Sequence, residues 1–221
     1  MRAVPVDPAD EYAVFQGVQL APLRTTEECR QLLSAIDQEA GQEMDSPNIQ
    51  LLTWNIKKGE ERNWERDLER FSVSKHLVLL QESAFSMRLG TAKSTNITQY
   101  ALTDTDQDLL VVNIHAFNFN FNFSFGLVTY RAQLDAVADV LPDHVGPVSV
   151  AGDLNTWRPG RLDALLASLK GLGLETVHFG EDLRRKAFGL PLDYVFVRGL
   201  SIEEASAFDV SSSDHNPMTA S

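Results

Sequence analysis

The stretch Pro147-Val148-Ser149-Val150-Ala151-Gly152-Asp153-Leu154-Asn155 shows the pattern on which the fold of this chain is built. It is an apolar run of strand length that ends in a carboxylate and an amide. A run of this kind suits a strand covered on both faces, as in the sheets of α/β proteins. Further strands are expected over residues 49–56, 77–80, 109–114 and 192–197.

Segments with helical periodicity lie between these strands and before the first of them. Thr25 and Glu28 form a capping-box pattern, which predicts a helix over residues 26–40. Because strands and helices alternate along the chain, the expected fold class is α/β. Apolar residues at helical spacing predict further helices over residues 62–72, 126–141 and 160–170.

The length of 221 residues and the hydrophobic content of 43% suit a globular protein with one large core. Residues 1–48 are interpreted as an N-terminal lead-in with one helix, and residues 49–221 as one domain. The single cysteine, Cys29, excludes an internal disulfide. The sequence shows neither a signal peptide nor an apolar run long enough to span a bilayer, so the expected compartment is the cytoplasm.

The net charge of −12 sets conditions on the partners of this chain. A field of that sign repels nucleic acid and anionic membranes at long range, so no membrane partner is expected. A phosphate ester could approach only with the help of a cation or of nearby basic residues. The basic residues that could meet a phosphate are Lys57, Lys58, Lys93, Arg158 and Arg161.

Phenylalanine alternates strictly with polar residues from Phe117 to Phe125. This period of two favours a strand extension or a low-complexity loop over an aromatic platform for stacking bases. Five phenylalanines on one face need cover, so self-association through Phe117–Phe125 is a further hypothesis.

Polar residues stand at the ends of the predicted strands. Because the ends of neighbouring strands converge, one cleft could gather all of them. So many carboxylates in one place require a cation, and oxygen ligands favour Mg²⁺, Mn²⁺ or Ca²⁺. Each residue also has a local alternative, such as an Asx turn or a surface ion pair. The residues are Asn55, Glu82, His115, Asp153, Asn155, Asp193, Asp214 and His215.

These segments resemble, in order, the motifs of the endonuclease/exonuclease/phosphatase family, which has the deoxyribonuclease-I-like fold. The resemblance is in particular to its uncharacterised bacterial members. It implies a four-layer α/β sandwich, with two mixed β-sheets face to face and helices outside. It also implies divalent-metal-dependent hydrolysis of phosphodiesters or phosphomonoesters, with Mg²⁺ or Mn²⁺ as cofactor and a substrate that could be nucleic acid. The matching segments are Thr53–Ile56, Leu80–Glu82, Asn113–His115, Gly152–Thr156, Leu192–Phe196 and Ser213–Pro217.

The resemblance also implies roles for the metal ligands and for one histidine. Glu82 matches the main metal ligand, and Asn55 and Asp214 match the residues that assist it. His215 matches the general base, or the group that contacts the scissile phosphate, and Asp193 matches the residue that orients it.

Three further residues match groups that act on the substrate. Asp153 matches the residue that activates the water or protonates the leaving oxygen. Asn155 matches the group that holds the phosphate or the nucleophile. His115 matches the group that stabilises charge on the phosphoryl oxygens.

The interval from Glu82 to His115 is only 33 positions, which is much shorter than the family pattern. The chain is therefore expected to lack an internal block of strands and to have a first half that is shortened. An alternative function follows from this departure. The chain would then be a degenerate, poorly active family member that binds metal, phosphate or a protein partner.

Overall fold

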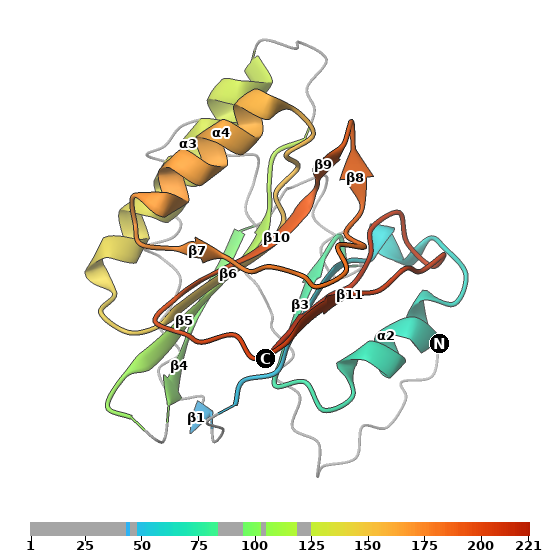
Figure 1. The fold of residues 1–221 in the computed structure, drawn as a ribbon, viewed down its shortest axis with the longest axis horizontal. Helices are drawn as coiled ribbons and strands as arrows, with labels where there is room; N and C mark the ends of the chain where they lie inside the picture. Colours follow the sequence, from blue (N-terminus) through green and yellow to red (C-terminus); the bar gives the residue numbers. More distant parts are fainter. Residues whose placement is uncertain (1–42, 45–47, 84–94, 103–104, 119–124) are drawn as a thin grey trace.

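The computed structural model describes residues 43–44, 48–83, 95–102, 105–118 and 125–221 (Figure 1). The helix expected over 26–40, Lys93 and most of the Phe117–Phe125 repeat lie outside these residues. The lead-in expected over 1–48 is described only at its last residues.

The larger sheet has six strands in the order β1-β4-β5-β6-β10-β7. Its centre is the parallel pair of β5 and β6, and α3 forms the connection between them. β10 runs antiparallel to β6, so the first residue of β10 lies beside the last residue of β6. The bounds are β1 Glu43–Met44, β4 Thr95–Leu102, β5 Asp108–His115, β6 Val148–Asp153, β7 Glu175–Thr176, β10 Asp193–Arg198 and α3 Phe125–Val140.

The smaller sheet has four strands in the order β11-β12-β2-β3. β2 and β3 are parallel and are connected through α2, while β12 runs antiparallel to β2. The last strand of the chain therefore lies inside this sheet, between β11 and β2. The bounds are β2 Leu51–Asn55, α2 Trp64–Ser72, β3 Leu77–Gln81, β11 Ala205–Ala207 and β12 Met218–Ala220.

The strands of the larger sheet place alternate side chains in two different cores. Val112, Val150 and Phe196 face one core, where they pack with residues of α3 and of α4, Pro159–Lys170. Their neighbours Val111 and Val195 face the other core, where they pack with residues of β2, β3 and β12. Alternation is the natural period of a strand, so apolar residues at successive positions require cover on both faces.

The outer face of the smaller sheet is covered by α2. Trp54 of β2 meets Phe71 of α2 edge to face, with ring centroids 6.5 Å apart. Phe71 also packs against Phe208, at 4.9 Å between centroids. The order of layers is therefore helix, sheet, sheet and helices, as Figure 1 shows. This confirms the expected α/β sandwich of mixed sheets.

The strands and helices predicted between residues 49 and 197 are present, with ends shifted by a few residues. The short strands were not predicted, because two or three residues are too few to show a period. The elements that were not predicted also include the strand β4, the 3-10 turns η1 Lys57–Gly59 and η3 Leu141–Asp143, and the hairpin of β8 Lys186–Ala187 and β9 Leu190–Pro191. In the described part of the chain, no helix has the length and hydropathy to cross a bilayer.

Candidate active site

Three neighbouring strands of the larger sheet bring polar side chains to one edge. His115 ends β5, Asp153 ends β6 and Asp193 begins β10, and the strand register pairs each of the outer two with Asp153. Gly152 has a φ of +136°, and a Cβ there would collide with the backbone of Ile114 in β5. A glycine before Asp153 thus lets the two strands approach closely at the site.

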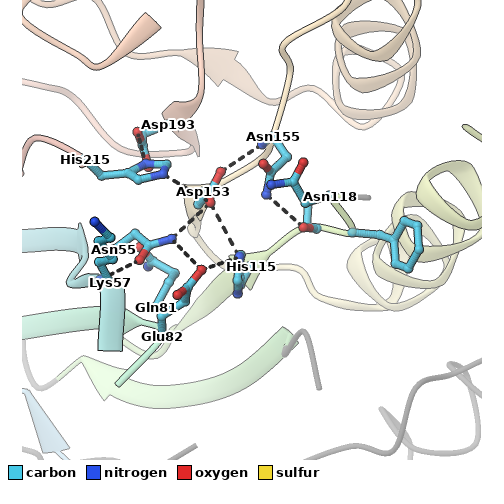
Figure 2. A network of polar contacts seen from close by, with 12 residues as sticks. Asn55, Lys57, Gln81, Glu82, His115, Asn118, Asp153, Asn155, Asp193 and His215 are labelled. Carbon is cyan, nitrogen blue, oxygen red and sulfur yellow. Dashed lines mark hydrogen bonds and ion pairs between the residues drawn. The ribbon is translucent and has the colours of Figure 1, made fainter. Parts of the chain in front are cut away.

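The smaller sheet contributes Asn55, the last residue of β2, and Glu82, the residue after β3 (Figure 2). Asn55 Nδ2 donates to Asp153 Oδ2 at 3.1 Å and lies 3.5 Å from Glu82 Oε1. His115 Nε2 lies 3.5 Å from both Glu82 Oε1 and Asp153 Oδ2. The strand ends of both sheets therefore meet around the Asp153 carboxylate.

His215 joins this group from the segment before β12. Its Nδ1 lies 2.8 Å and 3.0 Å from the two carboxylate oxygens of Asp193, and its Nε2 lies 3.7 Å from Asp153 Oδ2. The backbone of His215 is fixed as well, since Trp54 Nε1 donates to its carbonyl at 3.0 Å and its N–H donates to Ser213 Oγ at 3.2 Å. The Asp193 contact leaves Nε2 as the ring nitrogen directed at the site.

Burial and charge shift the pKa values of this group. Burial raises the pKa of the Asp153 carboxyl, and the nearby Asp193 charge raises it further, although His215 and His115 act in the opposite direction. Burial by itself would lower the pKa of His215, but the charge of Asp193 and its hydrogen bond raise it to about 10. His215 is therefore protonated at neutral pH in this arrangement.

Two of the site residues, Asp153 and Asn55, also make local turn contacts of the kind that the sequence offered as an alternative to a shared site. Asn155 N–H donates to Asp153 Oδ1 at 2.9 Å, and Lys57 N–H donates to Asn55 Oδ1 at 3.0 Å, so both side chains shape a turn. Asp153 uses Oδ1 for its turn contact and Asn55 uses Oδ1 for its own, so Asp153 Oδ2 and Asn55 Nδ2 face the site. For Asp193 a local alternative is a salt bridge to Arg184 or Arg185, which lie shortly before it in the sequence. The Arg184 guanidinium instead pairs with Asp182 at 2.7 Å.

Asn155 and Asp214 stand at the edge of this group. Asn155 has a φ of +49°, and its Nδ2 donates to the Ala116 carbonyl at 3.0 Å, so it links the segments after β6 and β5. Asp214 is exposed. Its charge contributes to the raised pKa of Lys57, for which Glu61 is the main cause. Asp214 therefore lies within electrostatic range of Lys57.

The side chains at the Glu82 end of this group suit a divalent cation better than those at the His215 end. Ligand atoms of Asp153, Asp193 and His215 lie within 4.8 Å of one another. However, a protonated His215 that is bound to Asp193 is a poor metal ligand. Glu82 offers carboxylate oxygens, and its side chain is 28% exposed, so an ion could reach it. Asn55 directs its Nδ2 at Glu82 and Asp153, while its Oδ1 accepts the Lys57 N–H.

Sequence reasoning missed a polar contact beneath the site, between the two sheets. Gln81 Nε2 donates to Asn113 Oδ1 at 2.7 Å and to Thr53 Oγ1 at 3.1 Å. Asn113 Nδ2 in turn donates to the Leu80 carbonyl at 3.2 Å. The sequence does contain a signal for this contact, because Asn113 is a polar residue in an otherwise apolar strand, two positions before His115.

The expected basic residues are used in different ways. Arg161 is buried, and its guanidinium donates to backbone carbonyls within the fold, so it is not a free phosphate contact. Lys57 pairs with Glu61 at 2.6 Å. Lys58 and Arg158 are exposed.

The endonuclease/exonuclease/phosphatase family model matches residues 52–215. The chain belongs to this family. The match takes in Asn55, His215 and every site residue between them, and this membership supports hydrolysis of phosphate esters as the class of reaction.

A relative and two solved structures are similar to this family member. A UPF0294 protein of Klebsiella pneumoniae (strain 342) is 35% identical over 217 residues, which takes in 77% of this chain and 80% of the relative. Since 77% of this chain is fewer than 217 residues, the matched span is longer in the relative.

The similarity to the solved structures concerns the fold. A humanized D. rerio TDP2 with 14 mutations has a TM-score of 0.60 at 16% identity, over 79% of this chain and 98% of that one. D. rerio TDP2 complexed with single strand DNA product has a TM-score of 0.57 at 15% identity, with the same coverage of 79% and 98%.

Proposed function

We propose that this protein is a divalent-metal-dependent hydrolase of phosphate esters. The observation that carries the proposal is the continuous set of contacts from Glu82 through His115 and Asp153 to His215 and Asp193. It joins the strand ends of two sheets. Phosphoryl transfer depends on positioning and charge neutralisation, and this group offers acidic, basic and cationic side chains for both.

Glu82, Asn55 and Asp214 are the residues that we propose to hold Mg²⁺ or Mn²⁺. Their oxygens are ligands of the hard type that these ions prefer. The Asn55 oxygen accepts a bond from Lys57 N–H, and an amide oxygen has a second lone pair for an ion. A bound ion would neutralise charge on the phosphate and lower the pKa of water.

Asp153 and His215 are the proposed proton-handling residues. Water forms a bond to phosphorus while the bond to the leaving oxygen breaks, and the Asp153 carboxylate takes the proton of that water. The raised pKa of Asp153 makes it a stronger base than an exposed aspartate. The raised pKa of His215 favours the phosphate-contacting role over the base, with its protonated Nε2 donating to a phosphoryl oxygen.

His115 and Asn155 complete the proposed arrangement. His115 Nε2 lies between Glu82 and Asp153, where it can donate to a second phosphoryl oxygen. Asn155 lies beside Asp153 and would hold the phosphate in line with the attacking water.

Small phosphate esters and DNA are the two candidate substrate classes. The single strand DNA product bound by D. rerio TDP2 supports a nucleic acid substrate. The net charge of −12 opposes a long polyanion and favours a small phosphodiester. The exposed Lys58 and Arg158 lie three positions after Asn55 and Asn155, so their replacement should affect DNA more than a small ester.

The test is hydrolysis of bis-p-nitrophenyl phosphate, single-stranded DNA and plasmid DNA with Mg²⁺ or Mn²⁺. We expect Glu82→Ala and His215→Ala to lower kcat/KM by on the order of a hundredfold or more. Glu65→Ala and His178→Ala are matched controls, since both residues are exposed and lie outside the site. Equal rates in all five proteins would reject this site.

A thermal unfolding series with Mn²⁺ separates the alternative function from the proposed one. We expect Mn²⁺ to raise the Tm of the wild type and of Glu65→Ala, and to raise the Tm of Glu82→Ala much less, because a ligand that binds only the folded state stabilises it. A Tm rise without turnover of any ester would support the degenerate, metal-binding alternative.

A further inference from the structure

Arg161 of α4 is a buried cation in an apolar core. Only 3% of its surface is exposed. In the described residues no carboxylate lies within ion-pair distance of it. Its guanidinium donates instead to backbone carbonyls: Nη1 to Phe117 at 2.6 Å and Asn155 at 3.1 Å, and Nη2 to Asn118 at 2.6 Å.

Such a residue is costly for the fold. Removing a charge from water costs several kcal/mol, and carbonyl dipoles offset this only when their geometry is good. Burial accordingly lowers the pKa of Arg161. The guanidinium carbon also lies over two aromatic rings, 4.6 Å from the Tyr130 centroid and 4.9 Å from the Trp157 centroid. An apolar side chain would fill this core without the free energy needed to remove a charge from water. The reason for an arginine here is therefore sought in the backbone carbonyls that it contacts.

The carbonyls that Arg161 holds belong to the two segments that leave β5 and β6 at the site. Phe117 and Asn118 follow His115 by two and three positions, and Asn155 follows Asp153 by two. Here the chain leaves the sheet, and ladder hydrogen bonds no longer fix it. Arg161 joins the two segments through a single rigid group.

Gln133 of α3 holds the first of these segments from the other side. Its Oε1 accepts the Phe117 N–H at 2.9 Å, and its Nε2 donates to the His115 carbonyl at 3.3 Å. The backbone around His115 is thus fixed by side chains from both helices that cover the larger sheet.

We propose that Arg161 is a positioning residue, which with Gln133 sets the places of His115 and Asn155 around Asp153. This inference rests on the proposed function. A displacement of about 1 Å at a site residue can cost on the order of a hundredfold in rate. Lysine cannot replace this arginine, because one ammonium group cannot reproduce the planar fork that meets three carbonyls.

Arg198 provides a matched control at the opposite end of the same sheet. It ends β10, whereas the site residue Asp193 begins that strand. Its guanidinium also donates to backbone carbonyls: those of Leu172 at 3.2 Å, Leu141 at 3.3 Å and His144 at 2.7 Å. The two arginines therefore make the same type of contact, but only Arg161 makes it beside site residues.

The first experiment compares Arg161→Lys with Arg198→Lys. We expect both to lower the Tm, and only Arg161→Lys to lower kcat, by about 10- to 100-fold with KM changed less than threefold. Gln133→Leu should lower kcat in the same direction and serves if Arg161→Lys fails to fold. Rates per folded molecule that fall equally for both arginine variants, or for neither, would overturn the proposal.

A double-mutant cycle tests whether Arg161 acts through Asn155. If it does, Arg161→Lys combined with Asn155→Ala should lose little more kcat than Asn155→Ala alone. Losses that multiply would show that Arg161 has no part in placing Asn155.

The second experiment does not depend on turnover. The ring resonances of His115 in the NMR spectrum of the metal-free protein should shift or broaden in Arg161→Lys and remain unchanged in Arg198→Lys. Unchanged His115 resonances in Arg161→Lys would reject positioning, whatever the activity. A wild type that hydrolyses no ester, together with shifted resonances, would reject the proposed function and keep the positioning.

Discussion

At the scale of single residues, the Asp153 carboxylate makes several contacts at once. Asp153 accepts the Asn155 N–H with one carboxylate oxygen and contacts Asn55, His115 and His215 with the other. A buried carboxylate needs several partners, and these partners are also the groups that could act on a substrate. Asp193 and His215 form a further pair in which both residues are buried, with His215 Nδ1 2.8 Å from a carboxylate oxygen of Asp193.

This pair predicts a pH dependence of stability. The pKa of His215 is raised from 6.5 to about 10 in the folded state. The stabilisation is therefore complete below pH 6.5, the value expected for the unfolded chain, and is lost as the pH rises through about 10. Between pH 7 and pH 9.5, the free energy of unfolding should fall more steeply with pH in the wild type than in Asp193→Asn. The two slopes should differ by about 1.4 kcal/mol per pH unit at most. Urea unfolding in the presence of EDTA measures both slopes, and parallel slopes would contradict the prediction.

At the scale of elements, the hairpin of β8 and β9 carries a residue that does not suit its turn. Phe188 and Gly189 connect the two strands, and both have positive φ, at 52° and 84°. This is the backbone of a type I′ turn, for which Asn-Gly is the usual sequence. A phenylalanine in the left-handed region is strained, and the Phe188 side chain is 90% exposed, so it gains little from packing.

Phe188→Asn should therefore stabilise the protein by about 1 kcal/mol, because asparagine tolerates the left-handed region. The expected change in Tm is about 2–4 °C for a chain of this size. Phe188→Val is the opposing control, since a β-branched residue tolerates this conformation least. A Tm that falls in Phe188→Asn would show that the aromatic ring contributes more than the turn strain costs.

At the scale of the whole molecule, the two sheets must keep their relative position for the site to exist. Asn55 and Glu82 belong to one sheet, while His115 and Asp153 belong to the other. Apolar packing between the sheets is non-directional, so it does not by itself fix how far one sheet slides along the other. One directional contact between the sheets is that of Gln81 with Asn113, just beneath the site.

Gln81→Leu should cost about 1–3 kcal/mol, because it leaves the partly buried Asn113 oxygen without its donor. Replacing both residues, as Gln81→Leu with Asn113→Leu, should recover part of that loss, since neither partner is then left unsatisfied. Guanidinium unfolding of the two single variants and the double variant gives the coupling free energy. Additive losses would show that the two side chains do not act as a pair.

The sequence by itself determined the fold class, most of the longer strands and helices, and the residues that gather at the site. These follow from local patterns, such as the apolar runs before Glu82, His115 and Asp153, because burial and period act over a few residues. The family resemblance supplied the expected roles, and the family model confirms the membership.

Only the tertiary structure decided which atoms meet. Trp54 holds the His215 carbonyl across 161 positions of sequence, and Gln81 meets Asn113 across 32. Arg161 looked like a phosphate contact in the sequence but is a buried clamp on the segments after β5 and β6. Such contacts depend on strand order, register and the packing of one sheet on another. No local pattern encodes these, because they arise only when distant segments bury their apolar faces together.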